Sequence, residues 1–132
     1  MQRGITSPVA LINNQTVAAT ATVTGSWVPV GSGFAFGVWL AASSALGTSQ
    51  LTLVLHASPY DANVLNATTA SAAQYISQTL VTDTASAENA LIAYDPNTAM
   101  KYPVCAVRAL LTGGAANPAD TLATVLLTKY GL

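Results

Sequence analysis

The side chains of this sequence that could carry out chemistry gather around one histidine. His56 is the only histidine, and Ser58 and Asp61 follow it shortly along the chain. Serine, histidine and an acid are the groups of nucleophilic acyl transfer, in which the imidazole accepts the proton of the serine hydroxyl. Here the three lie too close along the chain, and the Ser-Pro-Tyr-Asp segment predicts neither a nucleophile elbow nor an oxyanion hole. The pattern therefore favours a histidine beside a turn, without a catalytic role.

The remaining reactive side chains predict no second site. A single histidine excludes a two-histidine metal site, and a single cysteine, Cys105, excludes a disulfide framework. Cys105 lies in an apolar run, where we expect a small buried residue. The carboxylates all fall in predicted turns, where they commonly bond the backbone, and nothing in their spacing indicates a glycosidase pair: Asp61, Asp83, Glu88, Asp95 and Asp120. We therefore predict no enzyme activity, no cofactor and no metal.

The composition indicates a protein made for contact. Hydrophobic residues form 52% of the chain and charged residues 7%, against roughly 25% charged in a typical soluble domain. Thr, Ser, Asn and Gln carry the polarity, and such a surface packs against another protein at little desolvation cost. The net charge of -1 also favours association. The basic residues are scattered, so we expect no nucleic-acid partner: Arg3, Lys101, Arg108 and Lys129.

Length and hydropathy predict one domain without a membrane segment. A chain of 132 residues has the size of a single domain. No stretch approaches the roughly 18 apolar residues of a membrane-spanning helix, and the first 14 residues lack the pattern of a signal peptide. We therefore expect no membrane partner and assembly in a cytoplasm.

Period-two patterns predict an all-β domain. The clearest strand is SQLTLVLHA, with three leucines on one face and Gln50, Thr52 and His56 on the other. About seven or eight strands predict an antiparallel β-sandwich or jelly roll, and we place strands at 15–23, 34–42, 49–57, 74–81, 89–94, 102–111 and 121–130. We expect the last two to be antiparallel partners. Residues 62–80 fit either strand or helix.

The first 14 residues are predicted to form an extended arm before a domain that spans 15–132. Their short apolar group includes Val9, Leu11 and Ile12. It is too short for a helix and poorly patterned for an independent strand. The arm could be donated to a neighbouring molecule or laid on a larger surface.

Two tryptophans and one arginine are the further candidates for contact. We expect Trp39 in the core and Trp27, beside Pro29, as an exposed anchor, with a carbohydrate-binding role for Trp27 and Tyr60 as an alternative. Arg108 interrupts an apolar strand. Its head either reaches solvent or pairs with Asp61 or Asp95, or it forms an ion pair between subunits. The candidate interface residues are thus Val9, Leu11, Ile12, Trp27, Tyr60 and Arg108.

Three segments resemble small β-sandwich virion proteins of tailed bacteriophages, above all capsid decoration (cement) proteins. They are LTLVLHASPYD at 51–61, YPVCAVRALLTGG at 102–114 and LATVLLTKY at 122–130, and in outline the resemblance covers about 15–130. It implies a homotrimer that binds the major capsid protein at threefold or quasi-threefold positions and stabilises the head against internal DNA pressure.

Other roles remain open at this point. They are a phage tail or head-completion component and a carbohydrate-binding or adhesin module. A main coat protein is disfavoured, because 132 residues lack the bulk of a tailed-phage shell subunit.

Overall fold

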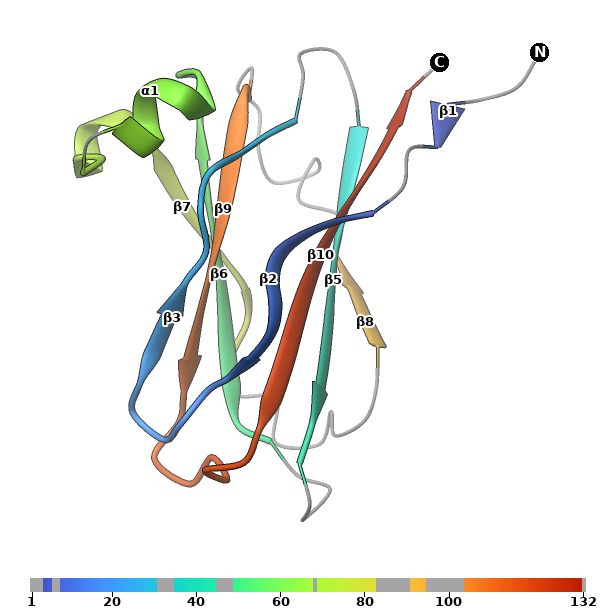
Figure 1. Ribbon diagram of the computed structural model, residues 1–132, viewed down its shortest axis with the longest axis vertical. Helices are drawn as coiled ribbons and strands as arrows, with labels where there is room; N and C mark the ends of the chain where they lie inside the picture. Colours follow the sequence, from blue (N-terminus) through green and yellow to red (C-terminus); the bar gives the residue numbers. More distant parts are fainter. Residues whose placement is uncertain are drawn as a thin grey trace.

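Two five-stranded antiparallel sheets face each other in the computed structural model of the chain (Figure 1). The structure describes residues 4–5, 8–30, 35–44, 49–67, 69–82, 91–94 and 104–131. The predicted all-β sandwich is therefore confirmed. Within the described residues, no helix is long and apolar enough to cross a membrane.

The first sheet has the order β1-β10-β5-β8, and β2 also pairs with β10. Its strands are β1 (Gly4–Ile5), β2 (Val9–Thr16), β5 (Ala35–Ser43), β8 (Leu91–Tyr94) and β10 (Leu122–Gly131).

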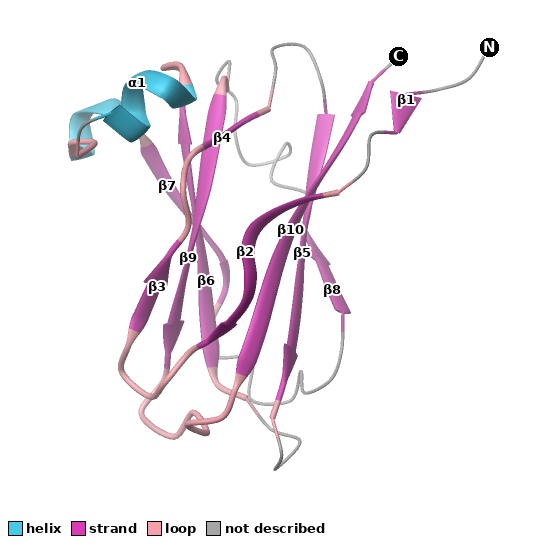
Figure 2. Cartoon of the chain, viewed as in Figure 1, coloured by secondary structure: helices cyan, strands magenta, loops and turns pink. Residues whose placement is uncertain are grey.

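The second sheet has the order β3-β9-β6-β7, and β4 also pairs with β9. Its strands are β3 (Thr22–Thr24), β4 (Val28–Pro29), β6 (Leu51–Ser58), β7 (Ile76–Val81) and β9 (Ala106–Gly113). A short helix, α1 (Ala62–Ala67), and a 3-10 turn, η1 (Ala72–Gln74), lie between β6 and β7 (Figure 2).

The core lies between the sheets because alternate side chains of each strand point inward. On β6 these are the three leucines of the predicted strand, and all three are fully buried. The facing strands supply their own inward residues, so the interior is apolar and mainly aliphatic: Phe36, Val38, Leu40, Leu51, Leu53, Leu55, Val107, Leu111, Val125 and Leu127.

The predicted arm is wrong for residues 9–14. These residues belong to β2, which pairs with β10 from Val9↔Leu127 to Thr16↔Leu122. Leu11 and Ile12 are each only 4% exposed and join the core. The short apolar group of residues 9–12 suffices for a strand here because β10 provides a partner strand, a contact that local sequence does not reveal. The boundary between an arm and a domain at residue 14 is likewise wrong.

The predicted strand over 15–23 is also wrong, because the chain crosses there from one sheet to the other. β2 ends at Thr16, β3 begins at Thr22, and buried Val17 donates its backbone N–H to the carbonyl of Thr121 at 2.9 Å. Thr20 has a φ of 59°, in the left-handed region that strands avoid.

The predicted pairing of the last two strands is wrong. β9 pairs with β6, β3 and β4, whereas β10 pairs with β5 and β2, so the two strands lie in opposite sheets. Asn117, in the connection between them, is 4% exposed. Its side chain donates to the carbonyl of Val17 at 2.6 Å and accepts the N–H of Gln50 at 2.9 Å. These bonds hold the connection across the end of the sandwich.

Candidate functional site

The segment between β6 and β7 folds back over the outer face of the second sheet and creates a second, smaller core. Trp27, Ala62, Leu65 and Ala106 form this core, and Ala70 and Tyr75 pack against it. A helix as short as α1 is not stable alone. Burial of Ala62 and Leu65 therefore supplies most of its stability.

Asn66 fastens α1 to the segment that carries Trp27. Its amide nitrogen donates to the backbone carbonyl of Trp27 at 3.0 Å, and its amide oxygen accepts the backbone N–H of Trp27 at 3.1 Å. One side chain thus satisfies both backbone groups of a residue that is only 4% exposed. Unpaired, these groups would destabilise the fold.

Beneath this cover lies a cluster of a cation and three rings, which we call the Arg108 cluster: Trp27, His56, Tyr75 and Arg108. The register of β6 and β9 sets His56 directly opposite Arg108. The Nε–H of Arg108 donates to Nδ1 of His56 at 3.1 Å. The guanidinium carbon lies 4.8 Å from the centroid of the Trp27 ring and 5.2 Å from that of Tyr75, within the range of cation–π attraction.

His56 is a neutral acceptor in this cluster. Its ring is stacked on Tyr75, with centroids 4.1 Å apart and planes 18° from parallel. Burial, and then the positive charge of Arg108, lower the pKa of His56 from 6.5 to about 4. Both effects disfavour the imidazolium form. At neutral pH the imidazole holds Arg108 in place.

The other two residues of the sequence-level catalytic hypothesis have structural partners. The Ser58 hydroxyl donates to the carbonyl of Gln74 at 2.6 Å and accepts the N–H of Tyr60 at 3.0 Å. The carboxylate of Asp61 accepts the N–H of Asn63 at 2.7 Å. The bonds to the N–H groups of Tyr60 and Asn63 shape the turn that leads into α1. The groups of Ser58 and Asp61 are thus engaged with the backbone, and no bond joins His56, Ser58 and Asp61 as a triad among the described residues.

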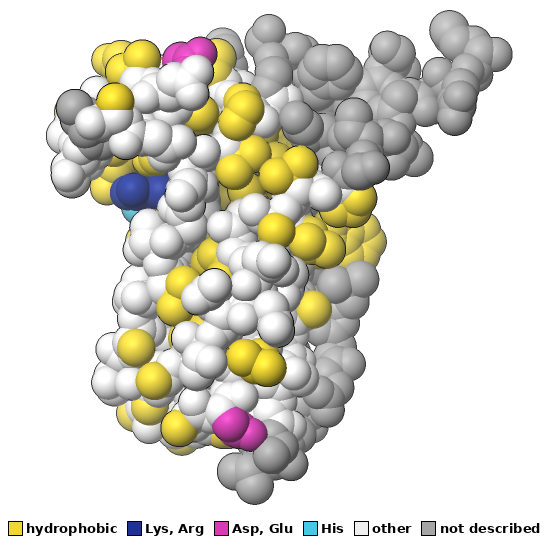
Figure 3. All heavy atoms as spheres, in the orientation of Figure 1, with side chains coloured by type: hydrophobic (Ala, Val, Ile, Leu, Met, Phe, Trp, Pro, Cys, Tyr) yellow, Lys and Arg dark blue, Asp and Glu magenta, His cyan; other side chains and the backbone are white. Residues whose placement is uncertain are grey.

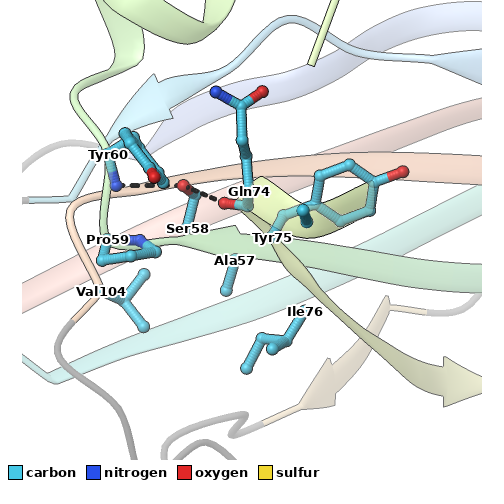
Figure 4. A pocket seen from close by; sticks show the side chains of 9 residues that line it. Ala57, Ser58, Pro59, Tyr60, Gln74, Tyr75, Ile76 and Val104 are labelled. Carbon is cyan, nitrogen blue, oxygen red and sulfur yellow. Dashed lines mark hydrogen bonds between the residues drawn. The ribbon is translucent and has the colours of Figure 1, made fainter. Parts of the chain in front are cut away.

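Ser58 also lines a cavity of about 260 Å³ at the end of β6 (Figure 4). Tyr60 and Ile76 at its mouth are 46% and 38% exposed. The lining is predominantly apolar: Ala57, Ser58, Pro59, Tyr60, Ala73, Gln74, Tyr75, Ile76 and Val104. Tyr75 belongs to both the cavity and the Arg108 cluster, so the two features adjoin.

The outer face of the first sheet has a different character. Trp39 on β5 is opposite Leu126 on β10, and together with Pro8 and Thr128 they line a shallow hollow. No charged side chain lines this hollow among the residues that the structure describes. Trp39 is half-buried, and Leu122, at the start of β10, is 38% exposed.

The predicted environments of the two tryptophans are therefore both wrong. Trp27, expected as an exposed anchor, is buried, and Trp39, expected in the core, lies on an outer face. The same burial of Trp27 removes the platform for the alternative sugar site with Tyr60. Cys105, expected to be buried, is half-buried.

The other candidate interface residues divide between the core and the surface. Leu11 and Ile12 are buried in the core, Val9 is half-buried in β2, and Tyr60 is exposed. Arg108 is half-buried and bonds to His56, whereas Asp61 bonds to Asn63.

Sequence reasoning missed Tyr75 and Asn66 altogether. A half-buried arginine on an apolar strand was a sign that aromatic or acidic partners must lie near it. Only the register and the fold of residues 59–75 identify them. Asp95, the second acid considered for Arg108, lies outside the described residues.

Comparisons with known proteins find a similar fold but no relative by sequence. No protein-family model matches the chain, and no curated protein matches it in sequence. Among solved structures, VP2 in a subviral particle of infectious bursal disease virus superposes with a TM-score of 0.57 at 11% identity. The match covers 98% of this chain and 33% of the VP2 chain. The chain has the β-sandwich fold of a viral capsid protein.

A second structure, of the Gx strain of infectious bursal disease virus, gives the same result. Its TM-score is 0.53 at 11% identity, over 98% of this chain and 32% of that one. This chain therefore spans about a third of the length of each of these two chains. At such low identity the likeness establishes the fold.

Proposed function

We propose that this protein is a non-enzymatic structural component of a virion, and that it decorates the outer surface of a capsid and stabilises it. The observation that carries the proposal is the likeness to VP2, which extends over 98% of the chain. A fold used in a viral shell fits a role that depends on contact.

The surface chemistry supports the same role. Only 7% of the residues are charged, so apolar and hydroxyl groups dominate what a neighbour would meet. The groups best suited to catalysis, His56 and Ser58, hold Arg108 and the turn at the end of β6. Repeated interfaces of about 1,000 Å² each would give firm attachment through avidity if the protein is a homotrimer.

The finer assignment follows the resemblance of residues 51–61, 102–114 and 122–130 to phage decoration proteins. On this proposal the partner is the major capsid protein, and the protein binds it at threefold or quasi-threefold positions. The protein would assemble in the host cytoplasm. A second candidate is a sandwich domain within a main coat protein, which the likeness to the coat protein VP2 favours.

Removal and return of the protein tests the proposal. Particles that contain the chain would be washed with graded denaturant and examined by electron microscopy. We expect the protein to leave while the shell stays intact, and we expect the stripped shells to release their genome at a lower temperature. Adding the purified protein back should restore the release temperature, and light scattering should show a trimer.

The alternatives predict other results. A coat-protein domain would leave only when the shell itself breaks, and a tail or head-completion component would be present in few copies at one vertex. Absence of the chain from particles would contradict the proposal outright.

A further inference from the structure

We propose that the Arg108 end of the second sheet is a binding site for a protein segment that carries a carboxylate next to an apolar side chain. The carboxylate would bind Arg108, and the apolar side chain would enter the cavity beside Tyr75. This inference rests on the proposed function, because the partner is the virion subunit that the protein contacts.

The guanidinium of Arg108 is already fixed in one orientation. Its Nε–H is bonded to His56, and its plane lies near the rings of Trp27 and Tyr75. The two terminal nitrogens of an arginine held in this way form the fork that binds a carboxylate through paired hydrogen bonds. Little side-chain entropy is lost on binding, since the arginine is ordered beforehand.

The positive charge of Arg108 is also without a counterion in the described part of the chain. Asp61, in the turn after β6, is exposed and accepts the N–H of Asn63, and His56 is neutral. Figure 3 shows cationic atoms at the surface below α1 with histidine atoms beside them. A half-buried cation among rings attracts an anion more strongly than one surrounded by water.

The nearby polar groups favour a protein over a sugar. A sugar needs several free hydrogen-bonding groups around it, but three polar side chains at this end are already engaged. The Ser58 hydroxyl bonds to Gln74 and Tyr60, the Gln74 amide oxygen accepts the N–H of Ser71, and the Asn66 amide bonds to Trp27. A nucleic acid needs several cations, and Arg108 is the single Lys or Arg of this cluster.

The adjoining cavity accounts for the apolar half of the partner. Its mouth is formed by Tyr60 and Ile76, both more than a third exposed, and its lining is mainly carbon. One apolar side chain fills such a space, whereas the carboxylate beside it fixes the register of the contact. The site thus combines affinity from burial with specificity from one charge pair.

Binding of purified variants to stripped particles tests this site. R108Q removes the charge and the fork, R108K keeps the charge alone, and K129Q removes one positive charge from β10 in the other sheet. We expect R108Q to weaken binding about tenfold or more, R108K to weaken it less and K129Q to leave it unchanged. Equal binding by R108Q and the wild type would overturn the inference.

Salt dependence gives a second measurement on the same proteins. Wild-type binding should weaken as ionic strength rises from about 0.01 M to about 1 M, over which the Debye length falls from about 30 Å to about 3 Å. R108Q should lose most of this dependence. An identical dependence in both proteins would also contradict the charge pair.

The cavity is tested with exposed residues, so the variants keep the fold. I76S should weaken binding, whereas V64S, on α1 at a residue that is 54% exposed, should not. Should R108Q prove unfolded by near-ultraviolet circular dichroism, equal binding by I76S and V64S would still overturn the inference. Retention of the wild type on beads coated with sialyllactose, lost in R108K, would overturn it in favour of an acidic sugar.

Failure of this inference and failure of the proposed function give different results. If the wild type does not bind stripped particles at all, the decoration role is wrong and the inference falls with it. If the wild type binds and R108Q binds equally well, the decoration role stands and only the site is wrong.

Discussion

The outer faces of the two sheets carry one tryptophan each, and the two residues have opposite surroundings. Trp27 is 4% exposed beneath α1, beside His56, Tyr75 and Arg108. Trp39 is half-buried on β5 and lines a shallow hollow. The difference arises because residues 59–75 return over one sheet, and no described segment covers Trp39 in this way.

This difference indicates which outer face can support a selective contact with a partner. Beneath the cover over the second sheet, His56 is only 7% exposed and holds Arg108 in fixed geometry, and polar contacts are stronger there than in water. Around Trp39, the described residues that line the hollow carry no charge. A contact there would gain affinity from area, and a contact at Arg108 would gain selectivity.

Replacement of each tryptophan by alanine tests most directly how much the cover over Trp27 contributes to stability. W27A should lower the free energy of unfolding by about 3–5 kcal/mol, as for a buried aromatic residue. W39A should lower it by about 1 kcal/mol, because much of that ring is already in water. Denaturant unfolding of the two variants measures both values.

A phenylalanine variant separates packing from hydrogen bonding at Trp27. The indole N–H has no hydrogen-bond partner among the described residues, so W27F should lower the free energy of unfolding less than W27A does. Equal losses for W27A and W39A would mean that the cover over the second sheet contributes little to stability.

The amide of Asn66 gives the next largest effect. N66A leaves the buried backbone N–H and carbonyl of Trp27 without their partner, and we expect a loss of about 1–3 kcal/mol. N63A serves as the matched control, because Asn63 is also exposed on α1 and the substitution keeps the bond from the backbone N–H of residue 63 to the Asp61 carboxylate. A loss in N63A as large as that in N66A would point to helix propensity in place of the Trp27 bonds.

The pH dependence of stability tests the neutral state of His56. The pKa of His56 falls from 6.5 to about 4 on folding, so the unfolded chain binds more protons between these values. The contribution of neutral His56 to the free energy of unfolding is therefore complete above pH 6.5, and it is lost as the pH falls toward 4. The difference in unfolding free energy between wild type and H56Q should narrow over this window.

Titration of the His56 imidazole by NMR measures the pKa directly, and R108Q should raise it, because one of the two causes of the shift is the charge of Arg108. A midpoint near 6.5 in the wild type would show that the imidazole is not held as a neutral acceptor.

Local pattern sufficed for the fold class and for most strands. The alternating leucines of β6 predict a strand with one buried face, and all three are fully buried in the core. Turn residues such as Pro59 and Asp61 marked the end of that strand correctly. Period-two alternation is a property of neighbouring residues, so it can be recognised without knowledge of the partners.

The candidate site could not be predicted to the same extent. Arg108 was identified as unusual, but its partner is His56, which lies 52 positions away and meets it only through the register of β6 and β9. Tyr75 and Trp27 join them because α1 and η1 carry the chain back across the sheet. No local sequence pattern predicts that the chain folds back across the sheet in this way.

By itself, the sequence determined a charge-poor chain of alternating strands that must bury one face of each. The tertiary structure alone decided which sheet each strand joins, so β9 and β10 separate and residues 9–14 become β2. It also decided which tryptophan is covered. The physical reason is that burial and strand pairing depend on contacts between distant residues, and many pairings satisfy the same local pattern.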